Sequence, residues 1–88
     1  MCHYYFFRFS QIALFMGQIK NEILLRKIAL QIKALRVERK LTQAAFFEDT
    51  SIHIARIETG RNNISVSTLN AICEYFEISL SDFFTNIK

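Results

Sequence analysis

The chain has 88 residues, enough for one domain with a modest core and too few for two. Hydrophobic residues make up 51% of it, Pro is absent and Gly occurs twice, a composition that excludes a disordered tail and favours a compact helical fold. The net charge of +3 is mild, so total charge alone does not indicate a nucleic-acid partner.

The chain begins with an apolar leader, residues 1–15, that is rich in aromatic side chains. Arg8 and Gln11 interrupt it long before the roughly 20 apolar residues that a membrane span needs, and the features of a signal peptide are missing. We therefore expect no membrane partner, and the alternative of a membrane-associated protein rests on this leader alone. The leader is either translated sequence upstream of a natural start at Met16 or a structural arm, and residues 16–88 are the expected folded domain.

A first long helix is predicted from about residue 21 to residue 39, because apolar residues recur there with a helical period. Residues 20–40 also carry seven Lys or Arg against two Glu, namely Lys20, Arg26, Lys27, Lys33, Arg36, Arg39 and Lys40 against Glu22 and Glu38. This basic face is compatible with phosphate attraction, and an ordinary solvated helix face explains it equally well.

Residues 41–60 predict two short helices joined by a tight turn. Thr42 can cap the first of them, and Thr50 or Asp49 the second. Gly60 stands where the end of a helix needs a residue that tolerates positive φ. This is the outline of a helix-turn-helix, which reads DNA with its second helix.

In that second helix, expected around residues 51–58, one side is apolar through Ile54 and Ile57 and the other exposes Ser51, His53 and Arg56. These three are the candidate base contacts. Arg56 is the strongest, because a guanidinium can bond guanine O6 and N7 together, although a phosphate contact or a surface ion pair is an equally good interpretation. Nothing places a metal partner near His53.

The rest of the chain predicts a polar loop and two more helices. The loop is Arg61-Asn62-Asn63, the next helix starts at Ser65 or Ser67, and the last starts at Ser79 and ends near Phe84. Cys73 falls on an apolar stripe and is expected in the core, in keeping with a reducing cytoplasm. Five helices and no convincing strand predict an all-α, compact five-helix bundle.

Five landmarks in order make residues 26–84 resemble the Cro/phage-repressor type of helix-turn-helix regulator. They are Ala34-Leu35-Arg36, Lys40-Leu41-Thr42-Gln43, Ile54 to Gly60, Ser65-Val66-Ser67-Thr68-Leu69 and Ile78 to Phe84. The resemblance implies a lambda-repressor-like fold, double-stranded DNA as partner, and a homodimer on a pseudo-palindromic site. It departs from the family pattern between Leu41 and Gly60, which is shorter and lacks the usual small residue and glycine at the turn.

The resemblance also implies roles for individual residues. Gln43 matches the family glutamine that binds a phosphate and braces the second helix, and Arg36 and Glu58 match a structural ion pair. The expected contacts to the DNA backbone are Thr42, Gln43, Thr50, Arg61, Asn62 and Asn63. Ile52 is either a core residue of a compressed turn or a contact to a thymine methyl group.

No spacing of nucleophile, base and oxyanion donor indicates an enzyme, and no cofactor or metal site is expected. The alternative function is an antitoxin-like or other protein-interaction module of the same fold. An apolar patch expected around Phe83, Phe84 and Ile87 would favour such a protein partner, or would serve as the dimer interface.

Overall fold

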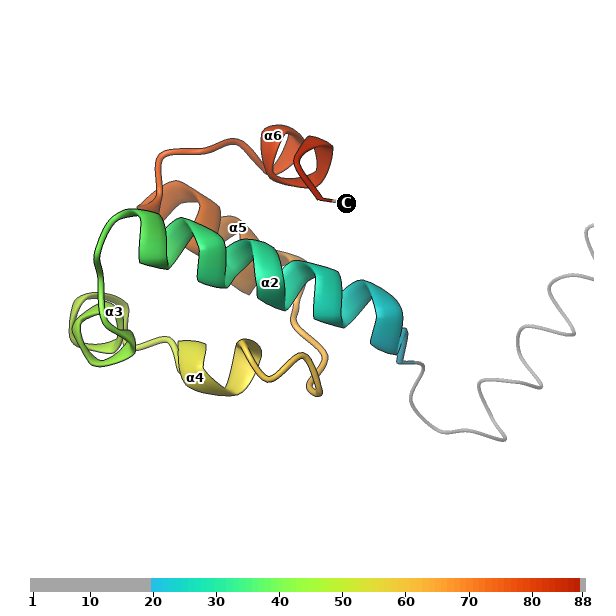
Figure 1. Cartoon of the computed structure of the whole chain (residues 1–88), viewed down its shortest axis with the longest axis horizontal. Helices are drawn as coiled ribbons and strands as arrows, with labels where there is room; N and C mark the ends of the chain where they lie inside the picture. The colour runs from blue at the N-terminus through green and yellow to red at the C-terminus, as the bar shows by residue number, and fades with distance from the viewer. Residues whose placement is uncertain (1–19, 88) are drawn as a thin grey trace, which may run out of the picture.

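The computed structural model describes residues 20–87, which form five helices (Figure 1). They are α2 (Glu22–Glu38), α3 (Gln43–Thr50), α4 (Ile54–Ile57), α5 (Val66–Tyr75) and α6 (Leu80–Thr85). No strand occurs within residues 20–87, so the predicted all-α five-helix fold is confirmed. The leader, residues 1–15, lies outside the described residues.

Most of these helices start at a polar residue whose side chain accepts a hydrogen bond from a backbone N–H of the first turn, as capping requires. The capping residues are Asn21 for α2, Thr42 for α3, Ser65 for α5 and Ser79 for α6. The predicted caps at Thr42 and Ser79 are therefore confirmed, and Ser65 rather than Ser67 starts α5.

The expected start of the second helix of the motif is wrong. Thr50 is the last residue of α3, and Ser51 follows it in the left-handed conformation at φ 61°, which ends that helix. The next helix begins only at Ile54, after His53, whose side chain makes no capping bond. Residues 51–53 form the connection between the two helices instead of the first turn of the second, so α4 spans a single turn, 54–57, rather than 51–58.

The core lies where α2 and α5 face each other and where α3, α4 and α6 close the sides (Figure 1). The rings of Phe46 and Phe76 stack at 5.6 Å between centroids, and Phe46 also meets Tyr75 edge-on at 4.8 Å. Fully buried side chains around them are Ile32, Ile54, Ile72, Cys73 and Phe83. Helices from all parts of residues 20–87 therefore share one aromatic core.

Three expectations about apolar residues can be judged from this core. Cys73 is buried, as predicted, and burial raises the pKa of its thiol. Ile52 is partly buried against the core, which favours its structural reading. Phe83, in contrast, is fully buried and does not belong to the expected surface patch, because α6 turns it inward while Phe84 stays 43% exposed.

Besides the apolar core, a contact between Arg39 and Phe76 holds the end of α2 to the end of α5. The Arg39 guanidinium lies 5.4 Å from the centroid of the Phe76 ring and also donates a hydrogen bond to the Phe76 carbonyl.

Within residues 20–87 no helix is both long and apolar enough to cross a lipid bilayer.

Candidate nucleic-acid interface

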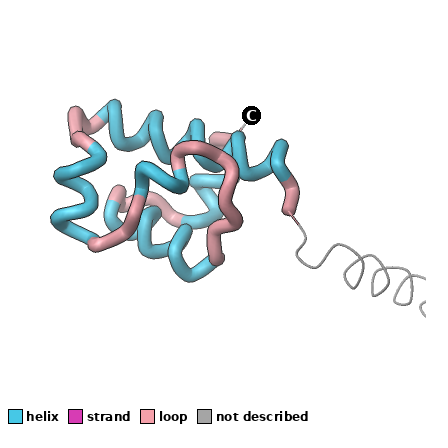
Figure 2. The backbone as a smooth tube through the Cα atoms, turned by 90° about the horizontal axis from the view of Figure 1, so that it is seen from below, coloured by secondary structure: helices cyan, strands magenta, loops and turns pink. Residues whose placement is uncertain are grey.

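One open hollow gathers most of the predicted DNA-reading residues beside α4. Figure 2 views the backbone from the side on which α4 lies, with α2 along the upper edge. The hollow is lined by Ser51, Ile52, His53, Arg56, Ile57, Asn62, Asn63 and Thr68. It thus brings together the three expected base contacts and two of the expected backbone contacts, and it adds Thr68, which the sequence reasoning missed.

The loop after α4 folds back onto that helix through one carbonyl. The Arg56 carbonyl accepts a hydrogen bond from Thr59 Oγ1 at 2.6 Å and another from Asn62 Nδ2 at 3.5 Å. The side chains of Ser51, His53 and Arg56 are exposed. Polar groups of α4 and of the loop therefore line one concave surface.

The His53 ring has a defined neighbour. It lies 4.7 Å from the Phe47 ring, centroid to centroid, at an interplanar angle of 36°. Both rings also line a smaller hollow between the start of α3 and α4, together with Gln43. This contact between α3 and α4 positions His53 at the border between the two hollows.

A largely buried ion pair holds α4 to α2. Arg36 Nε donates to Glu58 Oε2 at 2.7 Å and Arg36 Nη2 donates to Glu58 Oε1 at 3.0 Å, while the two side chains are only 12% and 5% exposed. The hydrogen bond to Glu58 raises the pKa of Arg36. Two parallel bonds fix the angle between guanidinium and carboxylate, so this pair orients α4.

Two further bonds extend the ion pair into a network. Arg36 Nη1 donates to the carbonyl of Leu41 at 2.8 Å, and Gln43 Nε2 donates to Glu58 Oε1 at 3.1 Å. The network joins α2, the start of α3 and the end of α4. Gln43, expected both to brace the second helix and to bind a phosphate, makes the bracing contact in this structure.

The two threonines expected at the DNA backbone differ in what their hydroxyl groups do. Thr42 Oγ1 accepts a hydrogen bond from the Ala45 N–H, which leaves its own hydroxyl hydrogen available to an anion. Thr50 Oγ1 donates to the Phe46 carbonyl at 2.8 Å and accepts from the Ile52 N–H at 3.1 Å. A phosphate oxygen needs a donor, and Thr50 already donates inside the protein.

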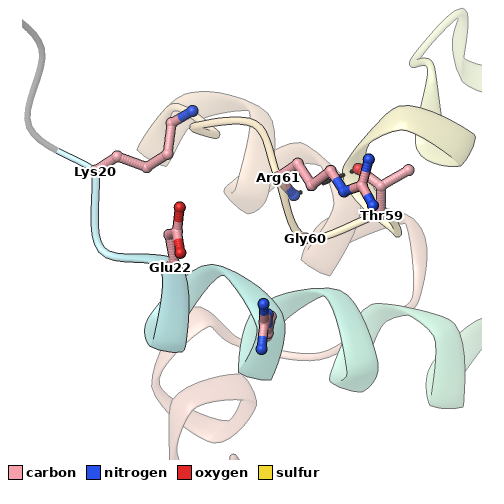
Figure 3. Close-up of a pocket in the computed structure, with 6 residues that line it drawn as sticks. Lys20, Glu22, Thr59, Gly60 and Arg61 are labelled. Atoms are coloured by element: carbon pink, nitrogen blue, oxygen red, sulfur yellow. Dashed lines mark hydrogen bonds between the residues drawn. The ribbon is translucent and has the colours of Figure 1, made fainter.

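Arg61 lines a different hollow, between the start of α2 and the loop after α4 (Figure 3). Gly60 sits there at φ 70°, and a Cβ atom on it would lie 3.2 Å from the Arg26 Cα atom. The glycine thus permits both the left-handed turn and the close approach of the loop to α2. The close-up shows Lys20 and Arg61 on two sides of the hollow, with Glu22 below them.

Arg26 is a basic residue near this interface that the sequence reasoning did not single out. It lines the same hollow as Arg61. Lys33 follows it seven residues later, on the same edge of the helix. The sequence analysis counted both cations in the basic face of residues 20–40. The signal that could have identified Arg26 was its spacing from Lys33, which places the two on one edge of the predicted helix.

The comparison with known families agrees with this architecture. A helix-turn-helix family model matches residues 32–83, more than half of the chain, and the chain therefore belongs to the Cro/C1-type helix-turn-helix family, a DNA-binding family. No curated protein and no solved structure matches the chain. The matched stretch begins inside α2, so the first turns of that helix, with Arg26, lie outside it.

Proposed function

We propose that the protein is a sequence-specific DNA-binding regulator that reads the major groove with α4 and the residues just before it. The observation that carries the proposal is the open hollow in which Ser51, His53 and Arg56 are exposed. In the same segment Ile54 is buried and Glu58 is held by Arg36. A rigid segment with exposed polar side chains is what base recognition requires.

Each reading residue offers a different contact. The Arg56 guanidinium can donate two hydrogen bonds to guanine O6 and N7. The Ser51 hydroxyl can donate or accept, so it discriminates bases less sharply. The His53 ring is steadied by Phe47 and presents one donor and one acceptor when it is neutral. Arg56 therefore supplies most of the sequence preference.

Backbone contacts position α4 in the groove. The start of α3 presents the Thr42 hydroxyl and backbone amides of the first turn, which favour an anion, next to the Gln43 amide. On the other side of α4, the loop presents Arg61, Asn62 and Asn63. Phosphates on both sides of the groove would thus bind the two ends of the motif.

The functional unit is a homodimer on a pseudo-palindromic site. Helix α4 has only four residues, and three side chains reach few base pairs from one copy. Two copies related by a two-fold axis double the contacts and match the symmetry of a palindromic operator. This proposal implies a protein that works in the cytoplasm, where its DNA is.

The test is selection of bound DNA from a random duplex library with the full chain at low salt, followed by sequencing. The expected result is one enriched, two-fold symmetric motif. The Arg56→Ala variant should lose preference at one position of each half-site, while Asn70→Ala, an exposed change on α5, should select the same motif as the parent. Enrichment of no motif would contradict the proposal.

A protein-interaction module of the antitoxin type is the second candidate. One observation favours it, namely that α2 exposes three large apolar side chains, Ile23, Leu30 and Val37. The selection experiment separates the candidates, because an interaction module would enrich no DNA motif at any salt concentration.

A further inference from the structure

Helix α2 has a second apolar face that nothing in the described chain covers. Ile23, Leu30 and Val37 are 71%, 68% and 55% exposed, and Lys27 and Ala34 between them are also exposed. We call these five residues the outer stripe. Their spacing alternates between four and three residues, which is the spacing of a helix–helix seam in a coiled coil.

The outer stripe lies opposite to the core. The buried residues of α2, among them Leu25, Ile28 and Ile32, point to the other side of the helix, toward the core that α5 shares. Near its middle the stripe continues into a shallow hollow lined by Lys27, Leu30, Gln31, Asn86 and Ile87. The apolar surface therefore runs along α2 and reaches the end of the described chain.

We propose that the outer stripe is the dimer interface, packed against the outer stripe of a second copy with the two α2 helices antiparallel. This inference rests on the proposed function, since it names the surface that pairs two DNA-reading copies. It also takes the place of the patch expected around Phe83, Phe84 and Ile87, of which Phe83 is buried in the core.

The position of α4 requires the antiparallel direction. Helix α4 lies below α2 in Figure 1, and it faces the viewer in Figure 2 while α2 runs along the upper edge. A two-fold axis that points at the viewer of Figure 2 turns α2 end for end and leaves both α4 helices on the same side. A parallel pair would need an axis along α2, which turns the second α4 to the opposite side, away from a shared duplex.

The charges on the stripe favour the same direction. A parallel pair would set Lys27 beside Lys27 of the partner in the middle of the seam, where like charges repel. Glu38, at the end of α2, lies along the same edge of the stripe as Lys27. In the antiparallel register that sets Leu30 against Ala34, each Lys27 meets the Glu38 carboxylate of the other copy, which gives two ion pairs.

A second copy is the occupant that these features specify. An interface with two-fold symmetry must be complementary to itself, and an outer stripe that contains Lys27 and has Glu38 along its edge meets that requirement. The long lysine stem can lie along the apolar seam while its ammonium reaches the edge. Within residues 20–87, moreover, the proposed reading helix α4 of one copy is a single turn, so a second copy would double the base contacts.

The test measures the mass of the full chain in solution as a function of concentration, by sedimentation or light scattering. The parent chain should reach twice its mass of 10.3 kDa. Leu30→Glu should weaken this self-association by at least about tenfold, the equivalent of one lost buried side chain. Val66→Glu is the matched control, because Val66 is similarly exposed, on α5 and off the stripe.

Charge reversal at the proposed ion pairs is the decisive part of this experiment. Lys27→Glu and Glu38→Lys should each weaken self-association, because each sets like charges against one another across the seam. The double variant, which exchanges the two charges, should restore it. Since these residues are exposed, the melting temperature of the monomer should change little, and circular dichroism checks this.

Two outcomes would overturn the inference. One is a monomeric parent chain, and the other is a dimer that survives Leu30→Glu, which would mean that another surface pairs the copies or that the leader covers the stripe. Either result leaves the proposed reading of DNA intact if a DNA motif is still enriched, but a monomeric parent chain would also contradict the proposed homodimer. A parent chain that dimerises through the outer stripe but enriches no DNA motif would contradict only the proposed reading of DNA. The proposed interface would then stand.

Discussion

Arg36 and Glu58 meet through two hydrogen bonds of 2.7 and 3.0 Å, between side chains that water barely reaches. Removing one member leaves a charge buried without its partner, so Arg36→Ala or Glu58→Ala should cost about 3 to 5 kcal/mol in the free energy of unfolding. Urea unfolding measures this cost. The double variant should cost clearly less than the sum of the two.

The exposed pair Asn70 and Glu74 on α5 is the control for that cycle, because an exposed pair of neighbouring turns contributes only about 0.2 to 0.5 kcal/mol. Equal coupling in both cycles would show that the Arg36–Glu58 pair contributes no more to stability than an exposed pair does.

The variants Arg56→Ala and Arg61→Ala should distinguish a contact that reads a base from a contact that positions the protein on the phosphate backbone. The first should cost about 1 to 3 kcal/mol in binding and relax preference at one base pair, because it removes a bidentate base contact. The second should weaken binding to all sequences alike, because it removes a phosphate contact. Titration of both variants against the selected site and one mismatched site checks this. An unchanged preference in Arg56→Ala would reassign the base contacts to Ser51 and His53.

Binding should weaken steeply with salt. Each phosphate that a protein cation neutralises adds about −0.9 to the slope of log K against log salt concentration. A dimer with roughly six such contacts should therefore give a slope near −5. Arg26→Ala, at the hollow shared with Arg61, should make the slope less steep if Arg26 joins this set. A flat response in the parent chain would refute the electrostatic part of the proposal.

Stability should fall in the alkaline range through Tyr75. Its phenol donates a hydrogen bond to Asp49 Oδ2 at 2.7 Å, and this bond raises the pKa of Tyr75 above the ordinary value of 10.0. A raised folded-state pKa means that the stabilisation is complete below about pH 10 and is lost as pH rises through the higher folded value.

The Tyr75→Phe variant tests this pH dependence. The other tyrosines are present in both proteins, so their titration drops out of the difference between variant and parent. The variant should be less stable than the parent at pH 8, and the difference in unfolding free energy should close as the pH rises above about 10. A difference that stays constant with pH would exclude the hydrogen bond as its cause.

Gly60→Ala should destabilise the protein through two effects at one site. A left-handed φ of 70° costs about 1 to 2 kcal/mol for a residue with a Cβ atom, and that atom would also meet the backbone of Arg26 at 3.2 Å. Thermal melting measures the loss. A Gly60→Ala variant as stable as the parent would mean that the loop can withdraw from α2 without cost.

The scaffold could be predicted from local chemistry. Thr42 and Ser79 precede their helices with capping side chains, and the apolar stripe of its helix placed Cys73 in the core. The family resemblance supplied the pairing of Arg36 with Glu58, which no local pattern reveals because the two are far apart in the chain.

The connection between α3 and α4 could not be predicted, because backbone conformation decided it. Ser51 adopts a left-handed φ that its residue type does not announce, and this single residue ends α3 and delays α4. Phe83 and Phe84 are neighbours of the same type, and only the angle at which α6 packs decides which of them is buried. The hydrogen bond that Thr50 donates to the Phe46 carbonyl is likewise invisible in the sequence.

Within residues 51–58, different side chains hold the segment in place and face the solvent. This separation has a consequence for how the protein can evolve. The side chains that hold this segment, Ile54 and Glu58, are distinct from Ser51 and Arg56, which have no part in the core. Under the proposed function, substitutions at the exposed positions should therefore change which DNA sequence is bound, with little loss of thermal stability. A library randomised at Ser51 and Arg56 should yield folded proteins with new targets, so that one framework could supply a set of mutually orthogonal regulators.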